Sequence, residues 1–349
     1  MVESWKSTYR LTIFAIGFAV VVVGLGAYTR LADAGLGCPD WPGCYGFVGV
    51  PMSTSAIATA EAAFPDAPVE VGKAWWEMIH RYFAGTLGLL IVAIAISAWR
   101  RRRSGIPLKL AFALVALVIC QGAFGAWTVT LKLWPQVVTA HLLGGFTTLA
   151  LLFLLALRLG LGQRFFVPGS LQRHAQIALV LVVLQVALGG WTSSNYAALA
   201  CHDFPGCQVE QAWPQMDFAK GFDVTQAVGP NYLGGQLDNA ARQTIHMTHR
   251  LGAVLVLLVV GALAWRLHRS SAHLGGRLAA VLAVQLTLGV TNIVWVLPLW
   301  NATLHNLGGA ALLLVLVAVN YGAFCSARSR VAVERGPGTV VGSTSPAAA

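Results

Sequence analysis

The chain has 349 residues, of which 57% are hydrophobic and only 10% are charged. So few charged residues cannot cover the surface of an ordinary soluble protein of this size, and a soluble fold is therefore excluded. The net charge of +10 is explained below by membrane topology, so no nucleic-acid partner is expected.

Apolar segments of bilayer length dominate the chain. A helix needs about 20 predominantly apolar residues to cross the hydrocarbon. The fold class that we predict is an all-α polytopic membrane protein with eight transmembrane helices. They are expected at 11–30, 76–98, 108–130, 137–157, 174–194, 243–265, 278–298 and 302–324.

Basic residues gather on one side of these segments. The N-terminus, the connections 99–109, 158–173 and 266–277, and the C-terminal tail hold 16 of the 23 Lys and Arg residues but only two acids. The opposite side holds 7 basic and 11 acidic residues. Since Lys and Arg are retained on the cytoplasmic side, both termini are predicted to be cytoplasmic.

The two ends of the chain refine this interpretation. The first apolar segment has full length and no small-residue cleavage site, so we expect a retained helix. The absence of an Arg/Ser-rich transit sequence favours a bacterial inner membrane. Residues 331–349, rich in Gly, Ser, Pro and Ala, are expected to form a disordered cytoplasmic tail.

The chain contains an internal repeat. Gly26 to Cys44 aligns with Gly189 to Cys207 at an offset of 163, while the later helices of each half align at 164 to 169. Each half holds four segments, so the repeat is parallel, and we predict two four-helix bundles. The domains are then 1–160 and 161–330, with long outer loops at 31–75 and 195–242 that could cover sites in the bundles.

Four histidines lie near the outer ends of their apolar segments, one pair in each half. They are His80 and His141, then His249 and His305. A buried imidazole can be a satisfied core side chain, a proton carrier or a metal ligand. Four at similar depth favour iron ligands: each pair can bracket one haem b, which needs no covalent CxxCH attachment.

Charged residues accompany the first histidine of each pair. Arg81 and Arg250 directly follow His80 and His249. They are predicted to pair with haem propionates; the alternative is an arginine that snorkels to water.

Glu77 precedes His80 by three residues, where the second half has His246. A carboxylate in that region could move protons or stabilise a developing cation, which assigns chemistry to the first half and electron transfer to the second. The alternative is a hydrated Glu77 that only pairs with Arg81 or Lys73. The role of His246 stays open.

Four of the six cysteines lie in the outer loops, as Cys38 with Cys44 and Cys201 with Cys207. The spacing permits a local disulfide in each loop, and the periplasm is oxidising. A structural staple and a redox role are both compatible with this pattern. Cys120 and Cys325, within helices, are expected to be small buried apolar residues.

These residues together resemble the haem A synthase family. The resemblance covers nearly the whole chain and rests on eight helices, Glu77-x-x-His80-Arg81, His141, His249-Arg250, His305 and the Cys38/Cys44 loop. It implies oxidation of the C8 methyl group of haem O to the formyl group of haem A, by successive hydroxylations. It also implies substrate haem between His80 and His141, a haem b cofactor between His249 and His305, and Glu77 as the functional acid.

Two other classes of protein share features of this pattern. A dihaem b-type electron-transfer subunit would place haems near opposite membrane faces, whereas all four histidines here lie toward one face. A transporter is also compatible with a parallel repeat. Membrane lipid surrounds the chain in every case. The resemblance implies haem O synthase and cytochrome oxidase assembly factors as partners, and a homo-oligomer is an open alternative.

Overall fold

The computed structural model describes residues 5–160, 167–209 and 213–334. Within them the chain is helical throughout, with no strand beyond an isolated bridge between Cys44 and Phe47. Eight helices are long and apolar enough to cross a membrane: α1 (Lys6–Leu31), α3 (Val71–Arg100), α4 (Leu108–Thr130), α5 (Pro135–Arg158), α6 (Gln172–Ser194), α8 (Asn239–His268), α9 (Ala272–Val294) and α10 (Leu299–Glu334). The short helices are α2 (Thr54–Ala63), η1 (Arg102–Ser104), η3 (Gly169–Leu171) and α7 (Phe218–Gly221).

All eight predicted segments are confirmed as helices, and the differences lie at their ends. α8 begins at Asn239 because the carboxylate of Asp238 accepts a hydrogen bond from the backbone N–H of Ala241 at 2.9 Å and caps it. α9 begins at Ala272, six residues before the predicted start, because a helix can continue through the interfacial region beyond the apolar stretch. α10 continues to Glu334, past the predicted tail boundary at 331, and residues 335–349 lie outside the described residues.

The outward faces of the helices are apolar. Leu89, Ile119 and Leu258 are 73%, 68% and 63% exposed. Such a surface on eight spanning helices is stable only where lipid covers it, because water would penalise so much apolar area. The protein is therefore a multi-pass membrane protein. Cys120 and Cys325 belong to this exposed surface, so the prediction that they are buried was wrong.

The long helices form two groups of four, which also pack against each other through α1 and α5 on one side and α6 and α10 on the other. In the first group, α1 and α4 each pack against both α3 and α5; in the second, α6 and α9 each pack against both α8 and α10. Each group encloses its own cluster of buried apolar side chains, although Ala310 and Leu313 of α10 also enter the first cluster. These contacts favour the division into two bundles, which stays a prediction.

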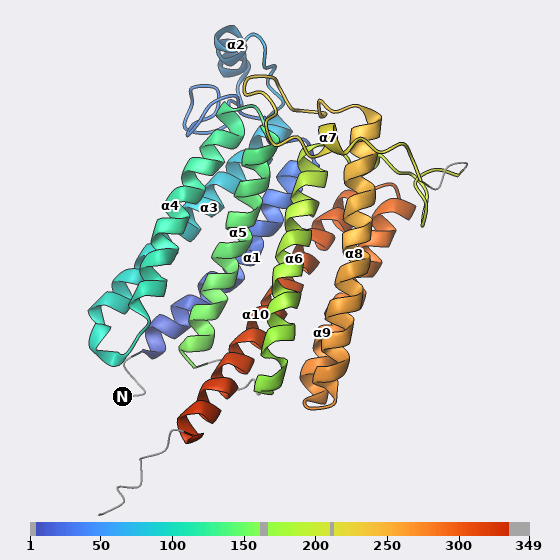
Figure 1. Ribbon diagram of the computed structural model, residues 1–349. Helices are drawn as coiled ribbons and strands as arrows, with labels where there is room; N and C mark the ends of the chain where they lie inside the picture. Colours follow the sequence, from blue (N-terminus) through green and yellow to red (C-terminus); the bar gives the residue numbers. More distant parts are fainter. Residues whose placement is uncertain (1–4, 161–166, 210–212, 335–349) are drawn as a thin grey trace, which may run out of the picture.

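The two ends of the helical bundle are different. The long loops, α2 and α7 gather at one end, which is uppermost in Figure 1. The first turn of α1 and the last described turn of α10 lie at the opposite end. The basic connection around η1 lies there too, as expected for a cytoplasmic side.

A buried asparagine joins α10 to the end of α9. Asn301 is fully buried; its amide donates to the carbonyl of Leu288 at 3.1 Å and to Oδ1 of Asn292 at 2.8 Å. We expect Asn301→Leu to destabilise the protein by about 1–3 kcal/mol, since buried acceptors lose their donor. Thermal unfolding in detergent micelles measures this. The exposed Asn239→Ala is the control, and an equal effect of both would contradict the prediction.

Candidate functional site

The four predicted histidines lie near the starts of α3, α5, α8 and α10, at the end of the bundle that carries the loops. His80 and His141 are close enough to interact electrostatically, and His249 and His305 form a second such pair. The structure thus brings together the residues that the sequence analysis paired, one pair in each group of helices.

Each histidine ring lies against a glycine of a neighbouring helix. A methyl group added to Gly26 of α1 would lie 2.8 Å from Cε1 of His80. The same contact recurs three times, at 3.2–3.4 Å: Gly125 with His141, Gly189 with His249 and Gly289 with His305. Because a larger side chain would displace the ring, these glycines fix where each imidazole lies. The glycines are expected from sequence to pack helices together, and their offsets of 163 and 164 pair them in the repeat.

Three of the four imidazoles keep a buried nitrogen free of partners. Within the part of the chain that the structure describes, Nδ1 of His80, His141 and His305 has no hydrogen-bond partner. A buried ring nitrogen without a protein partner suits a metal ligand, since buried polar atoms otherwise find a partner. The residues therefore fit a haem iron between each pair.

Glutamines support the histidines from adjacent helices. The side-chain amide of Gln185 lies 3.1 Å from Nδ1 of His249 and donates to the carbonyl of His249 at 2.8 Å. The amide of Gln285 lies 3.5 Å from Nε2 of His305. Such contacts orient an imidazole before it binds metal. Gln185 has no counterpart in the first half, where the aligned residue is Val22.

Glu77 is buried beneath the first outer loop. It is 4% exposed, accepts a hydrogen bond from the backbone N–H of Cys38 at 2.9 Å, and forms an ion pair with Arg81 at 2.5 Å. The alternative of a hydrated Glu77 is thus only half correct: the pairing with Arg81 is present, but the carboxylate is shielded from water. Lys73 pairs with Glu70 instead.

His246 occupies the matching place in the second half. Its Nδ1 accepts a hydrogen bond from the backbone N–H of Cys201 at 3.4 Å, as Glu77 does from Cys38. The backbone N–H of the first loop cysteine therefore donates to an acid in the first half and to an imidazole in the second half. The asymmetry predicted from sequence is present in the geometry.

Both loops are closed in the same way. Disulfides join Cys38 to Cys44 and Cys201 to Cys207, and all four cysteines are buried. Tyr45 seals the first loop by donating to the carbonyl of Pro68 at 3.0 Å. Burial, followed by nearby carboxylates led by Glu70, raises the pKa of Tyr45, so the phenol stays protonated and able to donate.

The two arginines bind the disulfide loops. Arg81 donates to the carbonyls of Asp40, Pro42 and Gly43. Arg250 donates to the carbonyls of Cys201, Asp203, Pro205 and Gly206. Their terminal nitrogens are therefore engaged by protein acceptors, and neither arginine simply snorkels to water. Propionate pairing, expected from sequence, stays a prediction.

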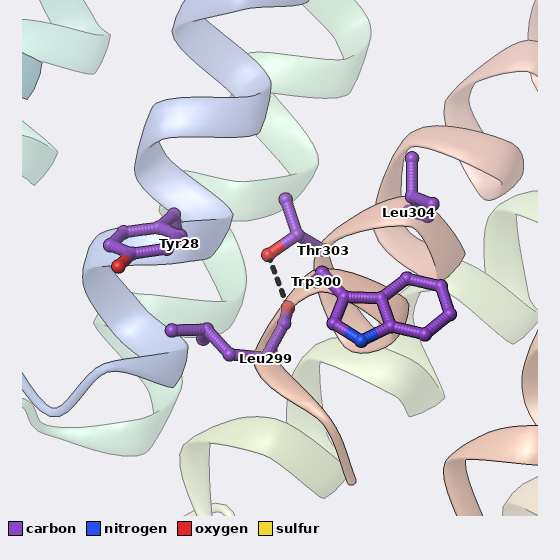
Figure 2. Close-up of a pocket in the computed structure, with 5 residues that line it drawn as sticks. All are labelled: Tyr28, Leu299, Trp300, Thr303 and Leu304. Carbon is purple, nitrogen blue, oxygen red and sulfur yellow. Dashed lines mark hydrogen bonds between the residues drawn. The ribbon is translucent and has the colours of Figure 1, made fainter.

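A shallow apolar hollow of about 550 Å³ lies between α1 and α10 (Figure 2). Tyr28 lines one side and Leu299, Trp300, Thr303 and Leu304 line the other. The hydroxyl of Thr303 is used within its own helix, on the carbonyl of Leu299. Trp300 and Leu304 are 57% and 45% exposed, so this hollow opens on the lipid-facing surface.

The fold and site define a class: an eight-helix membrane protein with two pairs of inward histidines beneath disulfide-closed loops. Comparison with known proteins agrees. Residues 9–317 match the family described as cytochrome oxidase assembly protein, COX15-CtaA. The chain belongs to this family.

Individual relatives share this length. The chain is 46% identical over 320 residues to a protein named heme A synthase from Shewanella oneidensis, covering 90% of this chain and 96% of that protein. It is 29% identical to one of the same name from Sphingopyxis alaskensis, over 86% of this chain and 87% of the relative. A relative from Hyphomonas neptunium, also named heme A synthase, is 28% identical over 86% of this chain and 88% of its own length.

The glycine contacts predict a steric test. Gly26→Ala should weaken the binding of added haem at the His80/His141 site several-fold, because the added methyl displaces the His80 ring. Gly17→Ala in the same helix is the matched control, since nothing lies within 4 Å of its added methyl. Titration of the purified protein with haem, followed in the Soret band, gives the readout. Equal affinity for added haem in both variants would contradict the role assigned to Gly26.

The two loop arginines should differ in their contribution to stability. We expect Arg81→Met to lower the free energy of unfolding by about 3 kcal/mol, more than Arg250→Met does, because it also leaves Glu77 buried and unpaired. Adding Glu77→Gln to Arg81→Met should recover part of the loss. Chemical unfolding in detergent measures all three variants. Equal losses for the two single arginine variants would refute this.

Proposed function

We propose that this protein is a haem A synthase, an oxidoreductase that converts the C8 methyl group of haem O to a formyl group. The observation that carries the proposal is the unequal pair of sites. Both halves hold two inward imidazoles, but only the first places a buried carboxylate, Glu77, one turn from its histidine. The names of the relatives support the same activity.

The first half would hold the substrate. His80 and His141 provide two imidazoles for the iron of haem O, and the Gly26 and Gly125 contacts set the positions of both rings. The methyl group on the porphyrin rim must then lie toward Glu77. Two successive oxidations of that carbon give a geminal diol, which loses water to form the aldehyde.

Glu77 is suited to accept protons as the methyl group is oxidised. Its carboxylate is shielded from water, so a developing cation nearby would be stabilised more strongly than in solution. Arg81 and the N–H of Cys38 fix its two oxygens in place. The disulfide loop thus positions the acid, which is compatible with a structural role for Cys38 and Cys44.

The second half would hold the cofactor. His249 and His305 would hold haem b through their imidazoles, with Gln185 and Gln285 orienting the two rings. Bound there, haem b supplies one-electron redox chemistry. Arg250 closes the Cys201/Cys207 loop above this site and is also proposed to contact the cofactor.

The rival function is a dihaem b-type electron-transfer subunit. All four histidines lie near the loop-bearing ends of their helices, so the haems would lie side by side rather than across the membrane. Haems in that arrangement would transfer electrons between two sites at one depth of the membrane. The arrangement therefore favours the enzyme over a subunit that carries electrons across the bilayer.

The cellular setting proposed is the bacterial inner membrane, with the loops in the periplasm and both termini in the cytoplasm. The basic connections lie at the end opposite the disulfide loops, as this orientation requires. Haem O synthase and oxidase assembly factors are the partners proposed to deliver substrate and receive product.

Haem chromatography tests the function. Membranes that contain this chain and a haem O synthase, in a host without haem A, should yield haem A. Glu77→Gln and His80→Ala should lower haem A at least tenfold, because each removes a group beside the reacting haem. His268→Ala, exposed at the opposite end, should leave it unchanged. Full haem A from Glu77→Gln would refute the role of that acid; bound haem B with haem O unconverted would favour the electron-transfer subunit.

A further inference from the structure

A guanidinium group lies at the boundary between the two halves. Arg30, in the last turn of α1, donates through Nη2 to the carbonyl of Ser193 in α6 at 2.5 Å, and its guanidinium stacks on Tyr196 with 4.2 Å to the ring centroid. The hydroxyl of Tyr196 donates to Asp33 at 2.9 Å. Arg30 and Ser193 are aligned residues of the repeat, as are Asp33 and Tyr196, so the contact joins equivalent places in the two halves.

Arg30 lies one turn outside the first histidine site. Gly26, whose face meets the His80 ring, precedes Arg30 by four residues, so both lie on the same face of α1. Four residues of helix rise about 6 Å toward the loops. The side chain of Arg30 thus lies on the loop side of the haem site, where the anionic propionates of a haem would extend.

The guanidinium has an unused donor. Arg30 is 15% exposed, and within the described residues its Nε is buried with no hydrogen-bond partner. Its one ionic neighbour is Asp33, whose half-exposed carboxylate lies 3.6 Å from Nη1. A buried N–H of a charged group without an acceptor is costly, which points to a ligand that supplies one.

The two halves differ in which arginines have a buried Nε without a hydrogen-bond partner. In the second half, Nε of Arg242 and Nε of Arg250 are also buried and unpartnered. In the first half, Nη2 of the aligned Arg81 is held by the Glu77 carboxylate, an acceptor that His246 does not replace. Among the described arginines of the first half, Arg30 is the one with a buried Nε that lacks a hydrogen-bond partner.

We infer that Arg30 binds a propionate carboxylate of the haem held by His80 and His141, through Nε. This inference rests on the proposed function, because it needs a haem in the first half. The carboxylate would accept a charge-assisted hydrogen bond from Nε while Nη2 stays on Ser193. Arg30 would then link substrate binding to the contact between the two halves.

Porphyrin esters test this directly. The purified chain, carrying its resident haem, is titrated with iron protoporphyrin IX and with its dimethyl ester, which lacks carboxylates, and binding is followed in the Soret band. The native protein should bind the acid about tenfold to a hundredfold more tightly than the ester. Arg30→Gln should lose that preference. Arg30→Lys keeps the positive charge but not the planar guanidinium with its several donors, so it should keep part of the preference.

Two variants separate this role from a structural one. Tyr196→Phe removes the hydroxyl on Asp33 but leaves Arg30 in place, so it should retain the preference for the acid. His80→Ala should abolish binding of both porphyrins at this site. If His80→Ala binds both porphyrins as tightly as the native protein does, the proposed substrate site itself is contradicted.

The inference about Arg30 fails by a different result. If Arg30→Gln binds haem but prefers the acid as strongly as native protein does, Arg30 does not hold the propionate. Should the same variant also lose thermal stabilisation by added phosphatidylglycerol, the acceptor of Nε is a lipid head group, and the inference is overturned.

Discussion

The close contact between a histidine ring and a glycine face is the constraint on which this structure depends. It occurs four times, and each time it joins two helices at the depth where an iron would be bound. An imidazole is bulky and polar, and it can lie between apolar helices only where the neighbouring backbone leaves room and where a partner satisfies its nitrogens. The glycines provide the room, and iron is the partner that the unpartnered nitrogens favour.

The loops follow from the same requirement. A haem bound near one end of the bundle must be covered where it meets water, and each half carries a loop closed by a disulfide. Carbonyl groups of each loop accept hydrogen bonds from the arginine that follows the first histidine of each pair. Without this arginine those carbonyls would be poorly satisfied. One side chain therefore ties the loop to the helix that carries an iron ligand, so loop and site form one unit.

The two halves align in sequence and repeat the same contacts around their histidines, but they differ at the residue that meets the first loop cysteine. The first loop cysteine of each half donates its N–H to an acid in one case and to an imidazole in the other. That exchange changes what the adjacent arginine can do, since Arg81 must neutralise Glu77 while Arg250 need not neutralise an acid. The proposed division into a substrate half and a cofactor half would thus come from one position in the two aligned halves.

The sequence by itself determined the membrane class, the eight helices, the pairing of the histidines and the two disulfides, because these depend on local composition and on spacing that the repeat makes visible. It did not determine the partners of Arg81 and Arg250, the burial of Glu77 or the exposure of Cys120. Those depend on which side chains meet across helices and loops far apart in the chain: Arg81 contacts residues about forty positions earlier. The glycine contacts and the bridge from Arg30 to Ser193 are of the same kind, since they join residues of different helices, which in the case of Arg30 and Ser193 lie 163 positions apart.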